Sequence, residues 1–184
     1  PEDIFAMPKL PDGKVIVLDD EGLHTGMGIA EWLAKSGADV EFLTPNFLPL
    51  SNRLMAAQDG RPMIQRFRAA GGKIFTMSYI REIGDRSVVV EDVHSDEKRI
   101  VTDVDAVVLT TSRIPSNTLE GELEGKVNQL FTIGDALAPR MWGAATFEGH
   151  KFARLIGEPN APRTIGEAYF SEDDPVLYPS PANA

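Results

Sequence analysis

The stretch from Lys14 to Pro45 constrains the fold more than any other part of this sequence. It opens with the apolar run Val15 to Leu18, which is typical of a strand buried on both faces of a parallel sheet. A second strand is indicated from Asp39 to Leu43. Between them lies a helical pattern that ends at Ser36-Gly37, with an apolar stripe of Met27, Ala30, Leu33 and Ala34. Strand, loop, helix and strand form one βαβ unit with a right-handed crossover, the entry unit of a dinucleotide-binding domain.

The loop of this unit, residues 19–26, departs from the dinucleotide fingerprint G-x-G-x-x-G. That fingerprint uses its first two glycines for the tight turn and for backbone approach to the pyrophosphate, and its third for helix–strand packing. Gly26 can supply the third glycine, Gly28 lies just inside the helix, and Gly22 lies in the loop. These three glycines are therefore the candidate cofactor-binding residues of the loop.

Two carboxylates stand where the first glycines should be. Asp19 and Asp20 would face a pyrophosphate, and like charges repel unless a metal ion intervenes. The acidic residue that usually binds the ribose 2′-hydroxyl falls near Thr44 here, and a threonine is a weak substitute. We therefore expect this unit to be kept as a scaffold, with weak NAD(P) binding at most.

Composition excludes several classes of function. The chain has 184 residues, 42% of them hydrophobic, and a formal net charge of -10, which disfavours nucleic acid and anionic membranes as partners. It has no cysteine, so it cannot by itself form disulfides, a thiolate nucleophile or a cysteine-ligated metal centre. The sequence fits a cytoplasmic location. No catalytic residue and no metal ligand set is indicated, because the three histidines lack ligand spacing.

The remaining chain suggests two folded portions. Residues 1–13 indicate a linker, and residues 14–115 one Rossmann-like domain. In that domain we predict a loop over 46–52, a helix over 61–70, and a strand over 106–110 of the buried parallel type. Between the helix and that strand, a β-meander is predicted from strand signals at 73–79, 87–92 and 99–102.

The second portion begins past Pro115. A short strand is predicted at 130–133, running into Gly134-Asp135-Ala136, and a helix at 144–156. Residues 161–184 are proline-rich and predict an extended C-terminal tail. Trp32 and Trp142 are expected to pack in cores.

Three segments together resemble a known family. They are VIVLDDEGLHTGMGIAEWLAKSGADV near the start, DAVVLTTSRIP at 105–115, and IGDALAPR at 133–140 followed by ATFEGHKFAR at 145–154. The order of elements resembles the pyridine-nucleotide disulfide reductases. More narrowly, the segments resemble the C-terminal region of the family of trimethylamine dehydrogenase, histamine dehydrogenase and 2,4-dienoyl-CoA reductase. Its amine dehydrogenases also have a degenerate glycine loop at this place.

The resemblance implies the fold class: an α/β, Rossmann-like three-layer domain of the FAD/NAD(P)-binding type with an inserted β-meander. The segment 116–160 would then be the C-terminal piece of a split FAD- or ADP-binding domain. Asp135, between Gly134 and Ala136, would accept a hydrogen bond from a cofactor hydroxyl, with FAD or ADP bound in the intact protein. Arg140 would either neutralise a phosphate or pair with Asp135.

The resemblance also implies a larger protein. Such enzymes carry FMN and a 4Fe–4S cluster in a TIM barrel that this chain does not match. We expect an excised C-terminal fragment rather than a separate subunit, inactive alone, whose partners are the barrel portion and an electron-transfer flavoprotein. The alternative is a ligand-free Rossmann scaffold that docks an interaction or electron-transfer partner. The acidic pair Asp19-Asp20 favours the scaffold for the first portion, whereas GDALAPR favours a nucleotide site in the second.

Overall fold

The computed structural model describes residues 1–164, and the chain divides into two compact units between Ser112 and Arg113. The first unit contains a parallel sheet of four strands in the order β3-β2-β1-β7. Their bounds are Lys73–Phe75, Asp39–Leu43, Lys14–Asp19 and Val104–Thr110. β1 lies at the centre, with Val17 beside Phe42 of β2 on one side and beside Val108 of β7 on the other.

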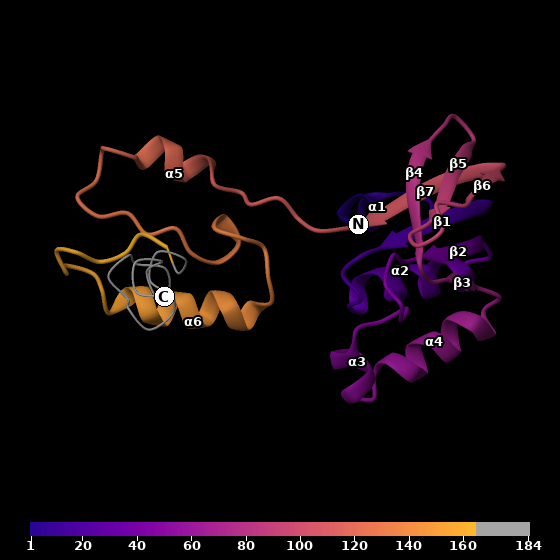
Figure 1. The fold of residues 1–184 in the computed structure, drawn as a ribbon, viewed down its shortest axis with the longest axis horizontal. Coiled ribbons are helices and arrows are strands. Elements are labelled where there is room, and N and C mark those ends of the chain that lie inside the picture. Colours follow the sequence, from indigo (N-terminus) through magenta and orange to yellow (C-terminus); the bar gives the residue numbers. More distant parts are fainter. Residues whose placement is uncertain (165–184) are drawn as a thin grey trace, which may run out of the picture. The chain divides into compact units, whose positions relative to one another are not determined.

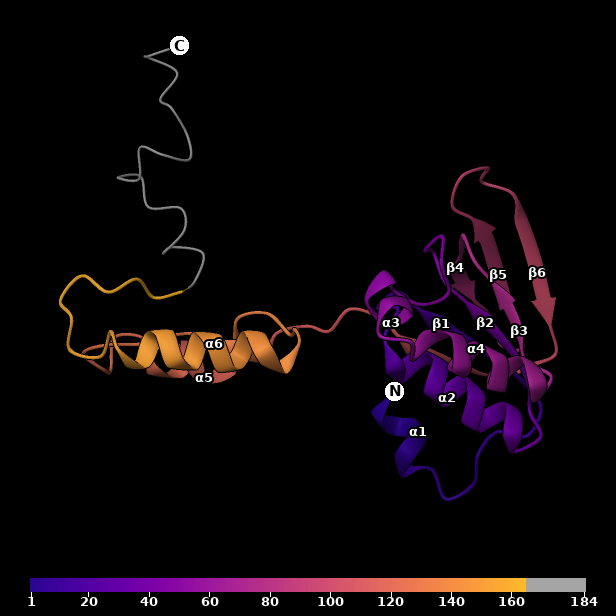
Figure 2. The ribbon, with the colours of Figure 1, turned by 90° about the horizontal axis from the view of Figure 1, so that it is seen from below.

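Helices cover one face of this sheet. α2 (His24–Lys35) connects β1 to β2, and α4 (Gly60–Ala69) connects β2 to β3 after the short α3 (Asn52–Ala56). Figures 1 and 2 show α2 and α4 side by side on that face. Phe67 of α4 meets Phe42 of β2 edge to face, with ring centroids 6.3 Å apart. The βαβ unit predicted from Lys14 to Pro45 is confirmed.

The antiparallel sheet covers the other face. Its strands are β4 (Ser78–Ile83), β5 (Ser87–Asp92) and β6 (Lys98–Thr102), which form a meander. Because side chains alternate along a strand, β1 sends Val15 and Val17 toward the helices, and Ile16 and Leu18 toward the meander. Each layer boundary therefore has its own hydrophobic core, and the expected three-layer fold with an inserted meander is confirmed.

An ion pair joins the two sheets. The Arg99 guanidinium on β6 donates to the buried Glu41 carboxylate on β2, with Nη2 2.8 Å from Oε2. The guanidinium also lies over the ring of Phe75 at 4.4 Å from its centroid. Stacking and pairing together anchor the edge strand of the meander to the parallel sheet.

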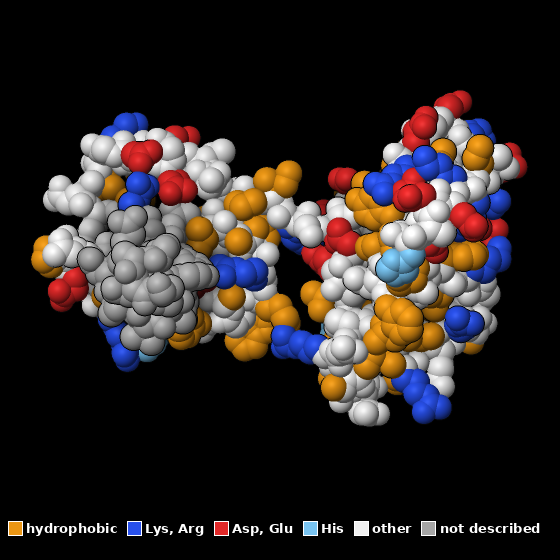
Figure 3. Space-filling view, viewed as in Figure 1, with side chains coloured by type: hydrophobic (Ala, Val, Ile, Leu, Met, Phe, Trp, Pro, Cys, Tyr) orange, Lys and Arg blue, Asp and Glu red, His pale blue; other side chains and the backbone are white. Residues whose placement is uncertain are grey.

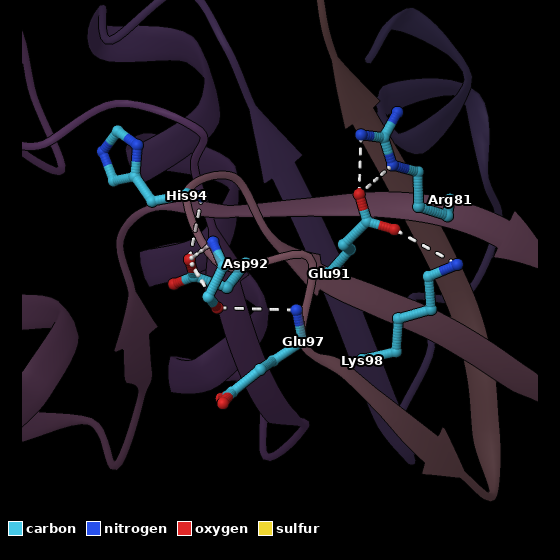
Figure 4. A network of polar contacts seen from close by, with 7 residues as sticks. Arg81, Glu91, Asp92, His94, Glu97 and Lys98 are labelled. Atoms are coloured by element: carbon cyan, nitrogen blue, oxygen red, sulfur yellow. Dashed lines mark hydrogen bonds and ion pairs between the residues drawn. The ribbon is translucent and has the colours of Figure 1, made fainter.

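A polar network holds the outer surface and the turn of the meander (Figure 4). Glu91 of β5 lies between Arg81 of β4 and Lys98 of β6, and the hydrogen bond from Arg81 is the main reason that its pKa is lowered. Asp92 accepts the backbone N–H groups of His94 and Ser95 and so closes the turn into β6. These contacts fix strand register, and nothing in them indicates chemistry.

Three details of the first unit differ from the sequence expectations. The strand predicted over 73–79 is two strands, because Met77 has a positive φ of 54° and turns the chain from the parallel sheet into the meander. The linker expected at 1–13 contains α1 (Glu2–Ala6), whose Ile4 is buried in the helix-side core. Trp32 is 40% exposed and stacks on Phe5 at 5.7 Å, so it is not a core residue.

The second unit, described to residue 164, contains α5 (Thr118–Leu123), the 3-10 turn η1 (Gly134–Ala136) and α6 (Trp142–Ala153). The strand predicted at 130–133 is wrong: the part of this unit that is described contains no strand with which that segment could pair. Trp142 is 79% exposed, which also contradicts the expected core position. The tail expected at 161–184 lies, from residue 165 on, outside the described residues.

Hydrophobic side chains reach the surface of both units (Figure 3). On α6 the most exposed large hydrophobic side chains are those of Trp142 and Phe147, whereas Phe152 packs inward against Phe131. None of the helices described up to residue 164 is both long and apolar enough to span a bilayer.

Candidate functional site

The loop after β1 is closed around the carboxylate of Asp19. This side chain is fully buried. Its Oδ2 accepts the backbone N–H of Gly22 at 3.0 Å, and its Oδ1 accepts the hydroxyl of Thr110 on β7, also at 3.0 Å. The backbone N–H of Gly22, which could otherwise donate to a bound phosphate, is therefore already hydrogen-bonded to the carboxylate of Asp19. This gives a physical basis for the expected weakness of the dinucleotide site.

Gly26 allows α2 to pack directly against this carboxylate. A Cβ at position 26 would lie 2.6 Å from both Cγ of Asp19 and Oγ1 of Thr110, closer than real side chains come. The third glycine of the fingerprint thus keeps its helix–strand packing role. In this chain, Gly26 packs against the side chains of Asp19 and Thr110.

The structure does not bring the three candidate glycines together. Gly22 has a φ of +64° and its carbonyl accepts the N–H of Ser51, which ties the loop after β1 to the segment before α3. Gly28 lies on the outer side of α2, in a hollow of about 410 Å³ beside Phe5 and Trp32. Gly22, Gly26 and Gly28 therefore face three different surroundings.

The electrostatics of the loop oppose an added phosphate. The pKa of Asp19 is raised to about 6, mainly by burial and to a smaller extent by the neighbouring Glu21 and Asp20, while the hydrogen bonds from Thr110 and Gly22 act in the opposite direction. Burial also raises the pKa of Asp20. Thr44, near the position of the ribose-binding acid, is fully buried and accepts the N–H of Asn46 at 3.2 Å. The hydroxyl oxygen of Thr44 is therefore already hydrogen-bonded within its own turn.

The second candidate site is η1 in the second unit. Gly134 has a φ of +60°, and a Cβ there would lie 3.4 Å from Cβ of Ala145 on α6, so glycine suits both the backbone and the close approach. Asp135 follows with an exposed side chain, and within residues 1–164 its carboxylate accepts no hydrogen bond. It does not cap the turn, because η1 has no side-chain cap.

Within residues 1–164, Arg140 pairs with Glu148 and not with Asp135. Its Nη2 donates to Oε1 of Glu148 on α6 at 2.6 Å, and its Nε donates to the carbonyl of Ala138 at 3.0 Å. The other oxygen of Glu148, Oε2, accepts the backbone N–H of Gly134 at 2.7 Å. Glu148 is 2% exposed. Of the two roles considered for Arg140, the pair with Asp135 is therefore not formed, and a buried carboxylate instead holds the turn against α6.

Sequence reasoning missed Glu148. It lies inside the segment ATFEGHKFAR, yet an acidic residue in a helix is usually solvated, and nothing in the sequence marks this one as buried. The signal that could have identified it is the glutamate four residues before Phe152, since positions i and i+4 share a helix face.

The first unit contains two of the histidines, His24 and His94. His24 begins α2 and lies 3.5 Å from Asp59, while His94 lies in the meander turn. Over residues 1–164, no group of three or more histidine and acidic side chains is placed to hold a metal ion. Within residues 1–164, the exposed carboxylate of Asp135 is left as an available hydrogen-bond acceptor.

Comparison with known proteins points to one group of enzymes. No protein-family model matches the sequence. The chain is 24% identical to dimethylamine dehydrogenase of Hyphomicrobium sp. (strain x) over 96% of its own length and 28% of that protein. It is 30% identical to a protein of Rhizobium meliloti (strain 1021) named probable N-methylproline demethylase, over 84% of the chain and 27% of that protein.

Solved structures agree. Histamine dehydrogenase from Rhizobium sp. 4-9 is 25% identical with a TM-score of 0.76, over 88% of this chain and 26% of that one. An HOCl-induced flavoprotein disulfide reductase from Escherichia coli is 14% identical with a TM-score of 0.52, over 90% of this chain and 40% of that one, which shows the fold alone. The chain spans about a quarter of the length of the curated relatives it matches. By these similarities the chain is homologous to a part of the proteins of the trimethylamine dehydrogenase family.

Proposed function

We propose that this chain is the C-terminal nucleotide-binding region of a flavin-dependent oxidoreductase of the amine dehydrogenase type. On its own it performs no catalysis. In the intact protein, FAD or ADP would be held partly by the second unit, while FMN and a 4Fe–4S cluster would belong to a barrel portion outside this sequence. That barrel portion and an electron-transfer flavoprotein are the proposed partners, and the cytoplasmic location stays a prediction.

The observation that carries the proposal is the state of Asp135. Its carboxylate is exposed and without a hydrogen bond in the described part of the chain, directly after a left-handed glycine that is packed on α6. A free carboxylate suits a ribose or ribityl hydroxyl, which donates a hydrogen bond to it. Asp135 would hold and orient that hydroxyl, and the bound nucleotide itself would supply any redox chemistry.

Two further features support a site completed by other parts of a protein. The segment 130–133 has no paired strand within residues 1–164, although its apolar residues resemble a buried strand. α6 exposes Trp142 and Phe147, large side chains that are usually covered. Both features are accounted for if another stretch of polypeptide adds sheet and apolar surface to the second unit.

Arg140 has a changed role in this proposal. Since its guanidinium is bound to Glu148 and to the carbonyl of Ala138, it stabilises the turn that presents Asp135. Gly134 and Ala136 form the turn itself. The first unit contributes no pyrophosphate site, because Asp19 fills its loop, and we propose that it serves as a scaffold with weak NAD(P) affinity.

The test is the spectrum and activity of the purified chain, together with the gene that encodes it. The expected result is a colourless, inactive chain, and a reading frame that continues upstream into a barrel with cluster-binding cysteines. A stoichiometric flavin spectrum, or amine dehydrogenase activity of the chain without added protein, would overturn the proposal. A reading frame that starts at this domain would instead indicate a separate subunit, and the fragment interpretation would be wrong.

A further inference from the structure

The segment from Asn52 to Lys73 carries a charge opposite to that of the whole chain. It contains four arginines and one lysine but a single acidic residue, Asp59, which gives it a net charge of +4. The whole chain has a net charge of -10. In the fold this segment forms α3, α4 and the start of β3, and Figure 3 shows basic side chains over the two helices. The helix layer of the first unit thus carries a local positive surface.

Two of these arginines lie on one stripe of α4. Arg61 and Arg68 have Gln65 between them, at a spacing that places the three side chains on one face of the helix. All three residues are exposed, whereas Met63 and Phe67 face the core. At a rise of about 1.5 Å per residue, the two arginines lie about 10 Å apart along the helix axis.

The guanidinium groups of Arg61 and Arg68 have no partner in the described part of the chain. Within residues 1–164 neither forms an ion pair or a side-chain hydrogen bond. Most other arginines in that range do pair with carboxylates, as Arg66 does with Glu31 at 2.8 Å. Because α4 has no acidic residue of its own, a neighbouring helical turn cannot supply the missing partner.

Arg61 also lies where its charge does not stabilise the helix. It is the second residue of α4, in the first turn, which is the positive end of the helix dipole. A cation is disfavoured at that end and an anion is favoured. The charge of Arg61 is therefore better suited to an anionic ligand than to the stability of α4.

The charge of the remaining chain restricts the kind of anion. At physiological ionic strength a surface charge acts over about 8 Å, so a short ligand on α4 meets mainly the local arginines. A nucleic acid or an anionic bilayer covers a larger area and would also face the acidic remainder of the chain. Carboxylates match the planar guanidinium and can accept two hydrogen bonds from it. The surface therefore fits a short acidic peptide segment.

We propose that the stripe of Arg61, Gln65 and Arg68 docks an acidic segment of a partner protein. Two carboxylates of that segment, about 10 Å apart, pair with the two guanidinium groups. In an extended polyproline II segment, side chains three residues apart lie on one side at a spacing of about 9 Å, which suits this pair. The stripe belongs to the first unit and does not depend on the nucleotide site proposed for the second.

Titration of the whole 184-residue chain by amide-resolved NMR tests the surface. The ligand is an acetylated peptide amide with glutamate at every third position and alanine or proline between. The control peptide has glutamine in place of each glutamate. We expect the glutamate peptide to shift the amides of Arg61, Gln65 and Arg68 saturably at millimolar concentrations, because exposed ion pairs are individually weak. Binding should weaken as salt is raised, and the glutamine peptide should give no saturable shifts.

Variants assign the binding to the two arginines. Arg61→Gln should weaken binding of the glutamate peptide several-fold, and Arg61→Gln combined with Arg68→Gln about tenfold. Both side chains are exposed and glutamine has nearly the helix propensity of arginine, so α4 should stay folded. Arg154→Gln, directly after α6 in the second unit, changes the net charge as much as Arg61→Gln and should leave binding unchanged.

The proposal is overturned by any of four results. These are the absence of saturable shifts at the three amides, equal binding of the glutamine peptide, equal losses in Arg61→Gln and Arg154→Gln, and tighter binding of a DNA duplex or of phosphatidylserine vesicles than of the glutamate peptide at the same amides. The last result would assign the stripe to an extended polyanion.

Discussion

The carboxylate of Asp19 lies against the α-carbon of Gly26, so that a methyl group at position 26 would come within 2.6 Å of Cγ and Oδ1 of Asp19. This contact brings the first turn of α2 onto the ends of β1 and β7, with Thr110 as the third member. In a dinucleotide-binding loop, backbone groups at this place face a pyrophosphate. Here they enclose the carboxylate of Asp19.

Gly26→Ala should destabilise the first unit. The added methyl group must displace a buried carboxylate, and overpacking of this kind costs about 1–3 kcal/mol. Gly28→Ala in the same helix is the matched control, because a Cβ there meets nothing within 4 Å and alanine favours the helix by about 1 kcal/mol. Urea unfolding followed by circular dichroism checks both. If the two variants unfold at the same urea concentration, the close contact with Asp19 does not affect the free energy of unfolding.

Asp19 should make stability depend on pH between about 4 and 6. Its pKa rises from 3.8 to about 6 on folding, so in this window the folded chain holds a proton that the unfolded chain has released. Stability therefore falls as pH rises through the window, by about 3 kcal/mol in total from this group. Asp19→Asn should remove that slope and unfold at higher urea than the parent at pH 8. A difference between the two proteins that does not change from pH 4 to pH 8 would contradict the prediction.

NADH and NADPH should bind the chain only at millimolar concentrations or above, an order of magnitude set by electrostatic repulsion and the loss of the loop donors. The N–H of Gly22 is already bonded to Asp19, and Asp20 is adjacent. Isothermal titration calorimetry measures this directly. Micromolar affinity for either nucleotide would show that the loop can open and accept a pyrophosphate.

Glu148→Ala should loosen the turn that carries Asp135. The substitution removes the acceptor of Gly134 N–H and the partner of Arg140, and a hydrogen bond to a charged group contributes about 1.5–3 kcal/mol. Glu148→Gln keeps an acceptor for Gly134 and should have a smaller effect. Hydrogen exchange of the amides from 134 to 150 reports the change. Equal exchange in the parent and both variants would mean that the pair contributes nothing to the turn.

The sequence predicted the layers of the first unit well because their signals are local. A buried strand such as Val15 to Leu18 and the apolar stripe of α2 follow from periodicity alone. The division at Met77 could not be predicted in this way, since a left-handed residue other than glycine has no compositional signal.

The candidate sites were less predictable because they depend on which acidic side chains become buried. Asp19 and Glu148 look like solvated charges in the sequence, yet both are enclosed by donors from distant residues, Thr110 and Arg140 among them. The strand expected at 130–133 failed for a related reason. A strand forms only against a neighbour, and the pattern of a segment does not reveal whether its neighbour lies in the same chain.

Asp135 is the residue on which the nucleotide site of the intact protein should depend. Its exposed carboxylate follows the packed turn at Gly134, and no side chain described up to residue 164 donates to it. A hydrogen bond from a cofactor hydroxyl to a carboxylate contributes about 1.5–3 kcal/mol in a dry site. Asp135→Ala in the full-length protein should therefore weaken the bound adenine nucleotide or FAD about ten- to a hundredfold. Asp135→Asn, which keeps an acceptor oxygen, should weaken it less. The FMN content should stay the same in both, because we propose that FMN binds in another domain. Cofactor content after dialysis, measured by chromatography of the released nucleotides, decides the matter: if Asp135→Ala retains its nucleotide as well as the parent does, Asp135 is only a turn residue.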